Sequence, residues 1–398
     1  MQEQEGPPAD FQLHGQDQPE KLSRQRHAPP APRARALGKT VVQSWTEQLR
    51  HPVNTLQRLE QFIETTPDER EAIATLKTVW GTTPHFASLM DPRDPACPIR
   101  RQVIPSLAER ENRYGRPDFL AWVEQGAEAT PACILKAYPD RVVFLASDRC
   151  ASYCRHCFRR DLILCPGRRP RLEREEGLRW LREHTEIRDV LVSGGDPFLL
   201  ADAEIDHLVR KLREIPHITL IRIGTRTPVV LPQRITPGLI KILRGYHRVP
   251  IWINLQCNHP REITEPMARA VYDLLSCGVS VGNQAVLLRG INDDVETFRE
   301  LHRRLLTIRV RPYYLFYCDF APGIDHFRTP LEKGAELIRD ALQGQITGLA
   351  QPHYVVSTNI GKIPIQVRER RSRAGRTARS CRLRNAEGKT VTLPRIPD

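Results

Sequence analysis

The sequence predicts an α/β fold in which six parallel strands, joined by helices, form an open, partial barrel. Short runs rich in β-branched residues alternate with amphipathic helical stretches through the middle of the 398-residue chain. Strands that alternate with helices pair in parallel through right-handed crossovers. Eight such units would close a barrel, so six predict an open one, with functional residues at the carboxyl ends of the strands.

The chain is predicted to have four parts, which differ in composition and periodicity. The first is rich in proline, glutamine and charge, so it cannot bury enough apolar surface to fold. The second has helical periodicity, with a helix start signalled at Thr66-Pro67, and ends in a proline-rich connector from Asp91. The four parts are a flexible N-terminal segment (1–38), an N-terminal helical subdomain and connector (39–135), the barrel (136–345), and a C-terminal segment with a basic tail (346–398).

The elements of the barrel are predicted from the change between strand and helix periodicity. The strands are expected at 141–146, 189–193, 220–224, 250–255, 280–286 and 311–317. The helical stretches between them are LEREEGLRWLREH, AEIDHLVRKLREI, PGLIKILRGY, EPMARAVYDLLSCG and VETFRELHRRLL.

Composition limits the function classes. No apolar run approaches the roughly 18 residues that would suggest a membrane span, and no signal peptide is visible at the start. Ten cysteines favour metal or redox chemistry in a reducing, cytoplasmic compartment. The net charge is +13, and from residue 362 onward eleven Lys and Arg residues stand against three acidic ones. Because the tail lacks stacked aromatics or a nucleic-acid-binding motif, a solvated face or subunit contact is expected and a nucleic-acid partner is not.

Three cysteines within eight residues are the strongest chemical signal. Cys150, Cys154 and Cys157 have the spacing Cys-x3-Cys-x2-Cys, which lets one loop surround a single inorganic centre. A [4Fe–4S] cluster normally takes four thiolates, so three would leave one iron open. Zinc is the main alternative, because His156 lies inside the run, and buried cysteines that only pack are the second. The cluster is the favoured interpretation, since no second cysteine pair accompanies the loop.

The loop and its surroundings resemble the radical S-adenosylmethionine (SAM) enzymes. The run YPDRVVFLASDRCASYCRHCFRR is similar to the lysine 2,3-aminomutase family in particular, and the resemblance extends from about Asp91 to about Pro364. It implies a partial (β/α)6 radical SAM barrel in which the open iron binds the amino and carboxyl groups of SAM. It also implies that reductive cleavage gives a 5′-deoxyadenosyl radical, with electrons from a partner such as flavodoxin or ferredoxin.

The resemblance places the SAM site on the strand ends. It assigns to this site Ser193, Gly194, Gly195 and Asp196 after the second strand, and Asn283 and Gln284 in the fifth. The glycines would let the backbone approach a ligand closely. Three further parts resemble the rim of the family's barrel without a defined role: the run Gly224-Thr225-Arg226-Thr227-Pro228, Asn254, and the run Asn258-His259-Pro260.

The family's second cofactor is pyridoxal 5′-phosphate (PLP), held covalently by a lysine. Lys362 is the matching residue, and Tyr138 and Arg141 match residues that contact PLP. Two positions depart from the family: Ala137 replaces a phosphate-binding arginine and Phe316 replaces a tyrosine. A phosphate dianion prefers arginine forks, so another cation, with Lys136 as the first suggestion, would be needed.

Three residues are expected to select the substrate. Arg159 matches the arginine that pairs with the substrate's α-carboxylate, and Asp319 matches one of two aspartates that hold the side-chain ammonium of lysine. Ser357 stands where the second aspartate is usual, in a loop two residues shorter. Because a delocalised guanidinium needs less point-charge compensation than an ammonium, arginine is favoured over lysine.

The sequence therefore predicts an isomerase, an amino acid 2,3-aminomutase acting on a free basic L-α-amino acid. Two alternatives remain open: a PLP-independent radical SAM enzyme acting on an amino acid, and a lysine 2,3-aminomutase-like enzyme that serves elongation factor modification and docks through the basic tail. A homo-oligomer is left open. The C-terminal zinc-binding cysteines that the resemblance would imply are missing, since only Cys381 lies beyond the barrel, so no zinc is expected.

Overall fold

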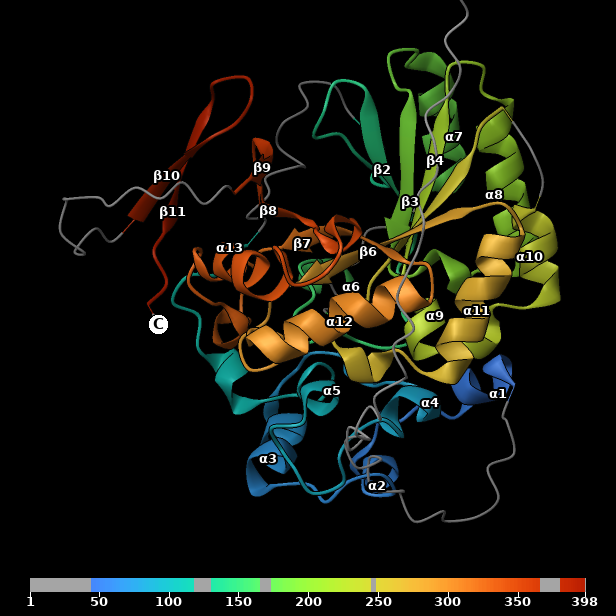
Figure 1. Ribbon diagram of the computed structural model, residues 1–398. Helices are drawn as coiled ribbons and strands as arrows, with labels where there is room; N and C mark the ends of the chain where they lie inside the picture. Colours follow the sequence, from blue (N-terminus) through green and yellow to red (C-terminus); the bar gives the residue numbers. More distant parts are fainter. Residues whose placement is uncertain (1–43, 118–129, 165–172, 245–247, 366–379, 398) are drawn as a thin grey trace, which may run out of the picture. The chain divides into compact units, whose positions relative to one another are not determined.

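Seven parallel strands, β2 to β8, form the centre of the protein (Figure 1). The computed structural model describes residues 44–117, 130–164, 173–244, 248–365 and 380–397. The sheet has nine strands in chain order, and β1 and β9 pair antiparallel at its two edges. The strands are β1 Ile134–Leu135, β2 Arg141–Ser147, β3 Asp189–Gly194, β4 Leu220–Thr225, β5 Ile251–Leu255, β6 Ser280–Val286, β7 Arg311–Phe316, β8 His353–Thr358 and β9 Gly361–Pro364.

The sheet is the predicted open barrel. The six predicted strands are confirmed as β2 to β7, each end within one residue of its expected place. Alternation along β4 shows how the strands divide their side chains: Ile221 and Ile223 are buried in the hydrophobic core, whereas Arg222 and Gly224 line a cavity on the other face. The structure adds β8 as a seventh parallel strand, which the sequence analysis did not predict.

The helices between the strands cover the outer face of the sheet (Figure 1). The longer helices each bury one apolar stripe; in α8 the stripe is Ile205, Leu208, Val209 and Leu212, at the spacing of one helical face. The predicted helical stretches are confirmed as α7, α8, α10, α11 and α12, although residues 172, 245 and 246 of the predicted stretches lie outside the described residues. The helices are α6 Arg160–Ile163, α7 Arg174–Glu183, α8 Asp202–Glu214, α9 Thr227–Val230, α10 Pro237–Leu243, α11 Glu265–Ser276, α12 Val295–Thr307 and α13 Lys333–Leu337.

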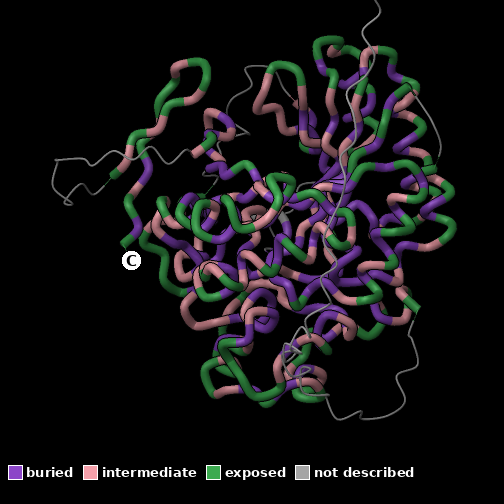
Figure 2. Tube along the Cα trace, in the orientation of Figure 1, coloured by how far each residue is buried: buried purple, intermediate pink, exposed green. Residues whose placement is uncertain are grey.

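Short helices precede the barrel and share its core. They are α1 Trp45–Arg50, α2 Leu56–Leu59, α3 Pro67–Thr75, α4 Pro84–Ala87 and α5 Pro98–Arg101. Helix α3 starts where Thr66-Pro67 predicted, because Thr66 and Glu69 form a capping box. Leu59, Phe86 and Ile99 belong to the same hydrophobic cluster as the barrel strands. Figure 2 shows the buried residues gathered along the strands and the helix faces that cover them.

Two hairpins follow the barrel. The first joins β8 to β9 through Gly361, whose φ of 96° suits glycine. The second is β10 Ser380–Arg384 with β11 Thr390–Pro394. The segment 1–38, expected to be flexible, and most of the basic tail, 366–379, lie outside the described residues, and the predicted part boundaries stay predictions. In the described part of the chain, no helix is long and apolar enough to cross a membrane.

Candidate active site

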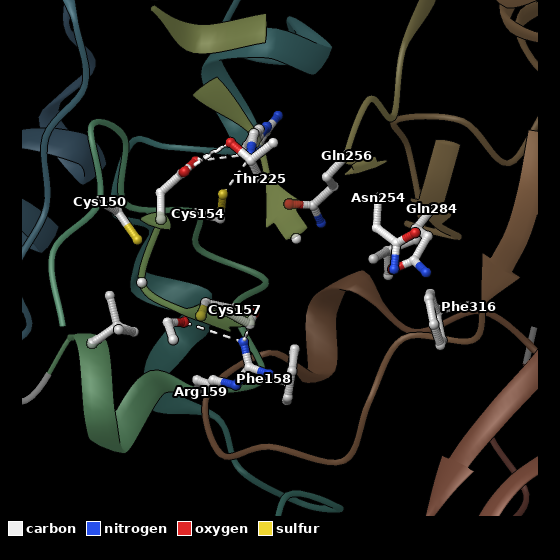
Figure 3. Close-up of a pocket in the computed structure, with 18 of the residues that line it drawn as sticks. Cys150, Cys154, Cys157, Phe158, Arg159, Thr225, Asn254, Gln256, Gln284 and Phe316 are labelled. Atoms are coloured by element: carbon white, nitrogen blue, oxygen red, sulfur yellow. Dashed lines mark hydrogen bonds between the residues drawn. The ribbon is translucent and has the colours of Figure 1, made fainter. Parts of the chain in front are cut away.

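A cavity of about 220 Å³ opens at the carboxyl ends of the parallel strands. Its walls come from the loop after β2, the ends of β3 to β6, the segment after β7, and the β8–β9 hairpin. Cys150, Cys154 and Cys157 lie on one side of it, and Gln256 and Phe316 lie across from them (Figure 3). The cavity therefore lies at the edge of the sheet where the sequence analysis expects the functional residues.

The cysteine loop is fixed by two buried arginines. Arg155 donates to both carboxylate oxygens of Glu109, at 2.7 and 2.6 Å, and Arg160 donates to the same carboxylate at 2.7 Å. Arg155 also bonds through its backbone N–H to the carbonyl of Gln102, at 2.7 Å. Among the described residues, no three Cys, His, Asp or Glu side chains converge closely enough for one metal ion. All three cysteines line the cavity, where a cluster held by three thiolates would lie.

The glycines after β3 pack against the start of the cysteine loop. A Cβ on Gly194 would lie 2.2 Å from the Ser147 carbonyl oxygen, and one on Gly195 would lie 2.2 Å from that of Arg149. The Gly195 N–H instead donates to Ser147 at 2.6 Å, and the Asp196 N–H donates to Arg149 at 2.7 Å. The glycines therefore let two strand ends that line the cavity meet closely.

Asp196 connects β3 to β4. Its carboxylate accepts hydrogen bonds from the Thr225 hydroxyl at 2.7 Å and the Arg226 N–H at 2.8 Å. Burial nevertheless raises the pKa of Asp196. Ser193, Gly194, Gly195 and Asp196 all line the cavity.

The two residues predicted in β6 differ in position. Gln284 lines the cavity, across from the cysteine loop (Figure 3). The Asn283 side chain instead bonds to the backbone of Cys257, accepting at 2.8 Å and donating at 2.9 Å. Asn283 is 2% exposed and does not line the cavity, so the structure places it as a support for the segment after β5.

Lys362 lies at the side of the cavity, on β9. Its backbone N–H donates to the Tyr138 hydroxyl at 2.7 Å, and its Nζ is 5.6 Å from the Tyr138 ring and 6.0 Å from the Phe316 ring. The Arg141 guanidinium lies 4.1 Å from the Tyr138 ring. Burial, helped by Arg222 and Arg141, lowers the pKa of Lys362 to about 8. A buried amine with a lowered pKa is suited to act as a nucleophile.

Arg159 and Asp319 each present an unpaired polar atom. Arg159 donates to the Ser193 hydroxyl at 2.9 Å and to the Gly194 carbonyl at 3.1 Å, but in the described part of the chain its Nε has no partner. The same holds for Oδ1 of Asp319. Burial raises the pKa of Asp319 to about 7, although Arg328, Lys362, Ser357 and Arg159 act to lower it. Both residues line the cavity, as does Ser357.

Comparison with known proteins agrees with this geometry. A sequence profile of the Radical SAM superfamily matches residues 145–302. The L-lysine 2,3-aminomutase of Clostridium subterminale is 42% identical over 326 residues, which cover 81% of this chain and 77% of that protein. The L-lysine 2,3-aminomutase of Bacillus subtilis (strain 168) is 43% identical over 328 residues, covering 81% and 68%. The glutamate 2,3-aminomutase of Clostridioides difficile (strain 630) is 40% identical over 325 residues, covering 80% and 75%.

This chain belongs to the lysine 2,3-aminomutase family. It is a radical SAM isomerase with a [4Fe–4S] cluster and SAM as cofactors, and PLP is the third cofactor that the sequence analysis expects. The described residues of this aminomutase fit all three cofactors. The three cysteines on one wall would hold the cluster, the ends of β3 and β6 would contact SAM, and the half-buried Lys362 would hold PLP.

The sequence analysis missed one cation of the aminomutase's cavity and misjudged another. Arg222 lines the cavity and donates to Asp189 at 2.8 Å. A lone charged residue in a buried, alternating strand was the available signal. Lys136, the suggested replacement for the missing arginine at Ala137, instead pairs with Glu186 at 2.7 Å and does not line the cavity. Arg222, Arg141 and Arg159 are the cations that act on Lys362.

Proposed function

We propose that this aminomutase is PLP-dependent and converts a basic L-α-amino acid into its β-amino acid, with arginine favoured over lysine. When bound, the cluster and SAM supply a radical that removes a hydrogen atom, and PLP supplies the carbonyl carbon that carries the amino group from the α-carbon to the β-carbon. The protein's own residues bind and orient the reactants.

One observation carries the proposal: two half-buried side chains of opposite charge type, Arg159 and Asp319, line one cavity, and each has a buried polar atom without a partner among the described residues. The free Nε of Arg159 suits the α-carboxylate of an amino acid, and the free Oδ1 of Asp319 suits a positively charged side chain. Both of these atoms are buried without a partner among the described residues, so a ligand that bonds to both compensates two unfavourable burials at once. A glutamate side chain would bring a second carboxylate toward Asp319, which like-charge repulsion disfavours.

The balance between arginine and lysine depends on Ser357. This residue lies beside Asp319 and contributes a hydroxyl where a second carboxylate would add a full charge. An ammonium is a compact, strongly hydrated charge, whereas a guanidinium is weakly hydrated and can bond to one carboxylate through two parallel N–H groups. A site with one carboxylate and one hydroxyl therefore favours arginine.

The surroundings of Lys362 support the proposed dependence on PLP. The rings of Tyr138 and Phe316 lie 5.6 and 6.0 Å from its Nζ, where they could flank a planar cofactor ring. Arg141 and Arg222 bring positive charge to the same place, as a phosphate dianion would require. Arg222 thus supplies a cation that the Ala137 position lacks.

A substrate panel tests the proposal. The reduced, anaerobic enzyme would be incubated with SAM, PLP and either L-arginine, L-lysine or L-glutamate, and the products identified by mass spectrometry and NMR. Arginine is expected to give its β-isomer with the highest kcat/KM. Turnover of glutamate alone would overturn the assignment of Asp319, and full activity in a PLP-free preparation would favour the PLP-independent alternative.

A variant at Ser357 tests the preference for arginine over lysine separately from the rest of the proposal. Ser357→Asp adds the second carboxylate, so it should raise kcat/KM for lysine relative to arginine by about tenfold, the effect of one further charge-assisted contact of roughly 1.4 kcal/mol. Ser357→Ala controls for loss of the hydroxyl alone. An unchanged ratio in Ser357→Asp would show that this position does not select the substrate.

We further infer a one-electron donor such as flavodoxin or ferredoxin as partner, and a cytoplasmic location. All nine cysteines within the described residues are unpaired, as a reducing compartment requires.

A further inference from the structure

Arg226 is a buried arginine whose guanidinium contacts a cluster ligand. Its Nη1 donates to the Sγ of Cys154 at 2.6 Å. The residue follows β4 in the run Gly224-Thr225-Arg226-Thr227-Pro228, to which the sequence analysis gave no role. It lines the cavity and is 7% exposed.

The other end of the guanidinium is held away from the cysteine loop. Nη2 donates to Gln102 at 2.7 Å and to Glu262 at 3.1 Å. Gln102 and Asn258 in turn bond to each other at 3.0 Å, and both bond to Glu262. This network fixes the orientation of the Arg226 side chain, so its Nη1 is held in place next to the Cys154 sulfur.

A cation at this position changes the energy of an electron on the cluster. Reduction potentials of iron–sulfur clusters depend on net charge, on hydrogen bonds to the sulfurs and on solvent exposure. One-electron reduction adds one negative charge to the bound cluster. An arginine is always charged, and in a buried site with little water its attraction for that charge is poorly screened. Its N–H bond to the Cys154 sulfur acts in the same direction.

We propose that Arg226 is a positioning residue that orients Cys154 and raises the reduction potential of the cluster, which eases electron entry from the reducing partner. Glu262 opposes this effect through its own negative charge, and it also holds the guanidinium in place. The proposal concerns the cluster alone, so it does not depend on the substrate or on PLP.

Potentiometric titration of the reconstituted holoenzyme with dithionite, followed by electron paramagnetic resonance, tests the proposal. Arg226→Gln should lower the midpoint potential enough to give about a tenfold smaller ratio of reduced to oxidised cluster at a fixed potential, which is about 59 mV for one electron. Glu262→Gln, which removes the opposing charge, should shift the potential in the other direction. Arg226→Lys keeps the positive charge but loses the two-pronged guanidinium. Its midpoint potential should lie between those of the wild type and Arg226→Gln.

Arg234 provides a matched control for burial. It is also fully buried, but it donates to the carbonyls of Phe198 and Leu200 and does not line the cavity. Arg234→Gln should lower stability and leave the midpoint potential unchanged. If Arg226→Gln cannot retain iron, Glu262→Gln and Arg226→Lys still decide the sign. Variants at Arg226 and Glu262 that bind a full cluster with wild-type potential would overturn the proposal.

Discussion

The reactivity of Lys362 is governed by whether its amine carries a proton. Burial and the charges of Arg222 and Arg141 lower its pKa to about 8, so the neutral, nucleophilic form grows as pH rises through that value. The rate of PLP attachment to the apoenzyme should therefore rise about tenfold between pH 7 and pH 9, because the neutral fraction does so. The measurement is the visible absorbance of lysine-bound PLP after rapid mixing.

Borohydride reduction then identifies the lysine. Mass spectrometry of the digested wild-type protein should find PLP attached to residue 362, and Lys362→Ala should carry none. Lys136→Ala is the control, since Lys136 pairs with Glu186 outside the cavity and its loss should leave PLP attachment intact. A lysine-bound spectrum retained by Lys362→Ala would assign the attachment to another residue.

Asp319 is expected to lower the stability of the folded protein at neutral pH while it binds the substrate. Its folded-state pKa, about 7, lies above the ordinary value of a carboxyl group, so the folded protein holds a proton that the unfolded chain has lost. Stability therefore falls as pH rises from about 4 to about 7, and the full cost is present above pH 7. Asp319→Asn should raise the free energy of unfolding at pH 8 by about 1–2 kcal/mol, because the cavity admits some water, and the gain should vanish near pH 4.

The same variant should bind its substrate worse. Loss of one charge-assisted contact costs about 1.5–3 kcal/mol, so KM for arginine should rise by roughly tenfold to a hundredfold. Urea unfolding at three pH values and steady-state kinetics measure the two effects. A variant that is both less stable at pH 8 and unaltered in KM would contradict the role given to Asp319.

At the scale of single elements, the sequence predicted what depends on local periodicity. Strands β2 to β7 and their helices follow alternating or helical patterns, and the cysteine loop is recognisable from spacing alone. The parallel strand β8 was not predicted, because its buried run Tyr354, Val355 and Val356 shows no alternation. Arg226 had no predictable role either, since its partners Cys154 and Gln102 lie 72 and 124 residues away in the chain.

The end of β3 makes one such non-local contact. A Cβ on Gly195 would lie 2.2 Å from the Arg149 carbonyl oxygen, so Gly195→Ala must push β3 away from the cysteine loop. We expect a loss of about 1–3 kcal/mol in stability and a lower iron content per chain. Gly348→Ala is the control, because a Cβ there meets nothing within 4 Å and should change neither quantity. Iron analysis and thermal unfolding measure both, and full iron content in Gly195→Ala would count against the contact.

At the scale of the whole molecule, the N-terminal region holds the catalytic loop in place. Glu109, 46 residues before Arg155, receives both buried arginines of the loop, and Arg155 also donates to the Val79 carbonyl at 2.9 Å and the Thr78 hydroxyl at 2.7 Å. Although burial alone would raise it, the pKa of Glu109 is lowered by Arg155 and Arg160. The ion pairs therefore contribute stability at neutral pH, and this is lost as pH falls through that lowered pKa.

Glu109→Gln would leave two buried guanidinium groups without their carboxylate. Removing one partner of a buried ion pair costs about 3–5 kcal/mol, so the free energy of unfolding of the reduced apoprotein should fall by that amount at pH 7. Iron content after reconstitution should fall as well, because the loop that carries the three thiols loses its anchor. Glu64→Gln is the matched control: its pair with Arg93 is exposed and contributes less than about 1 kcal/mol. If Glu109→Gln lost stability but kept full iron, the N-terminal region would support the fold without positioning the loop.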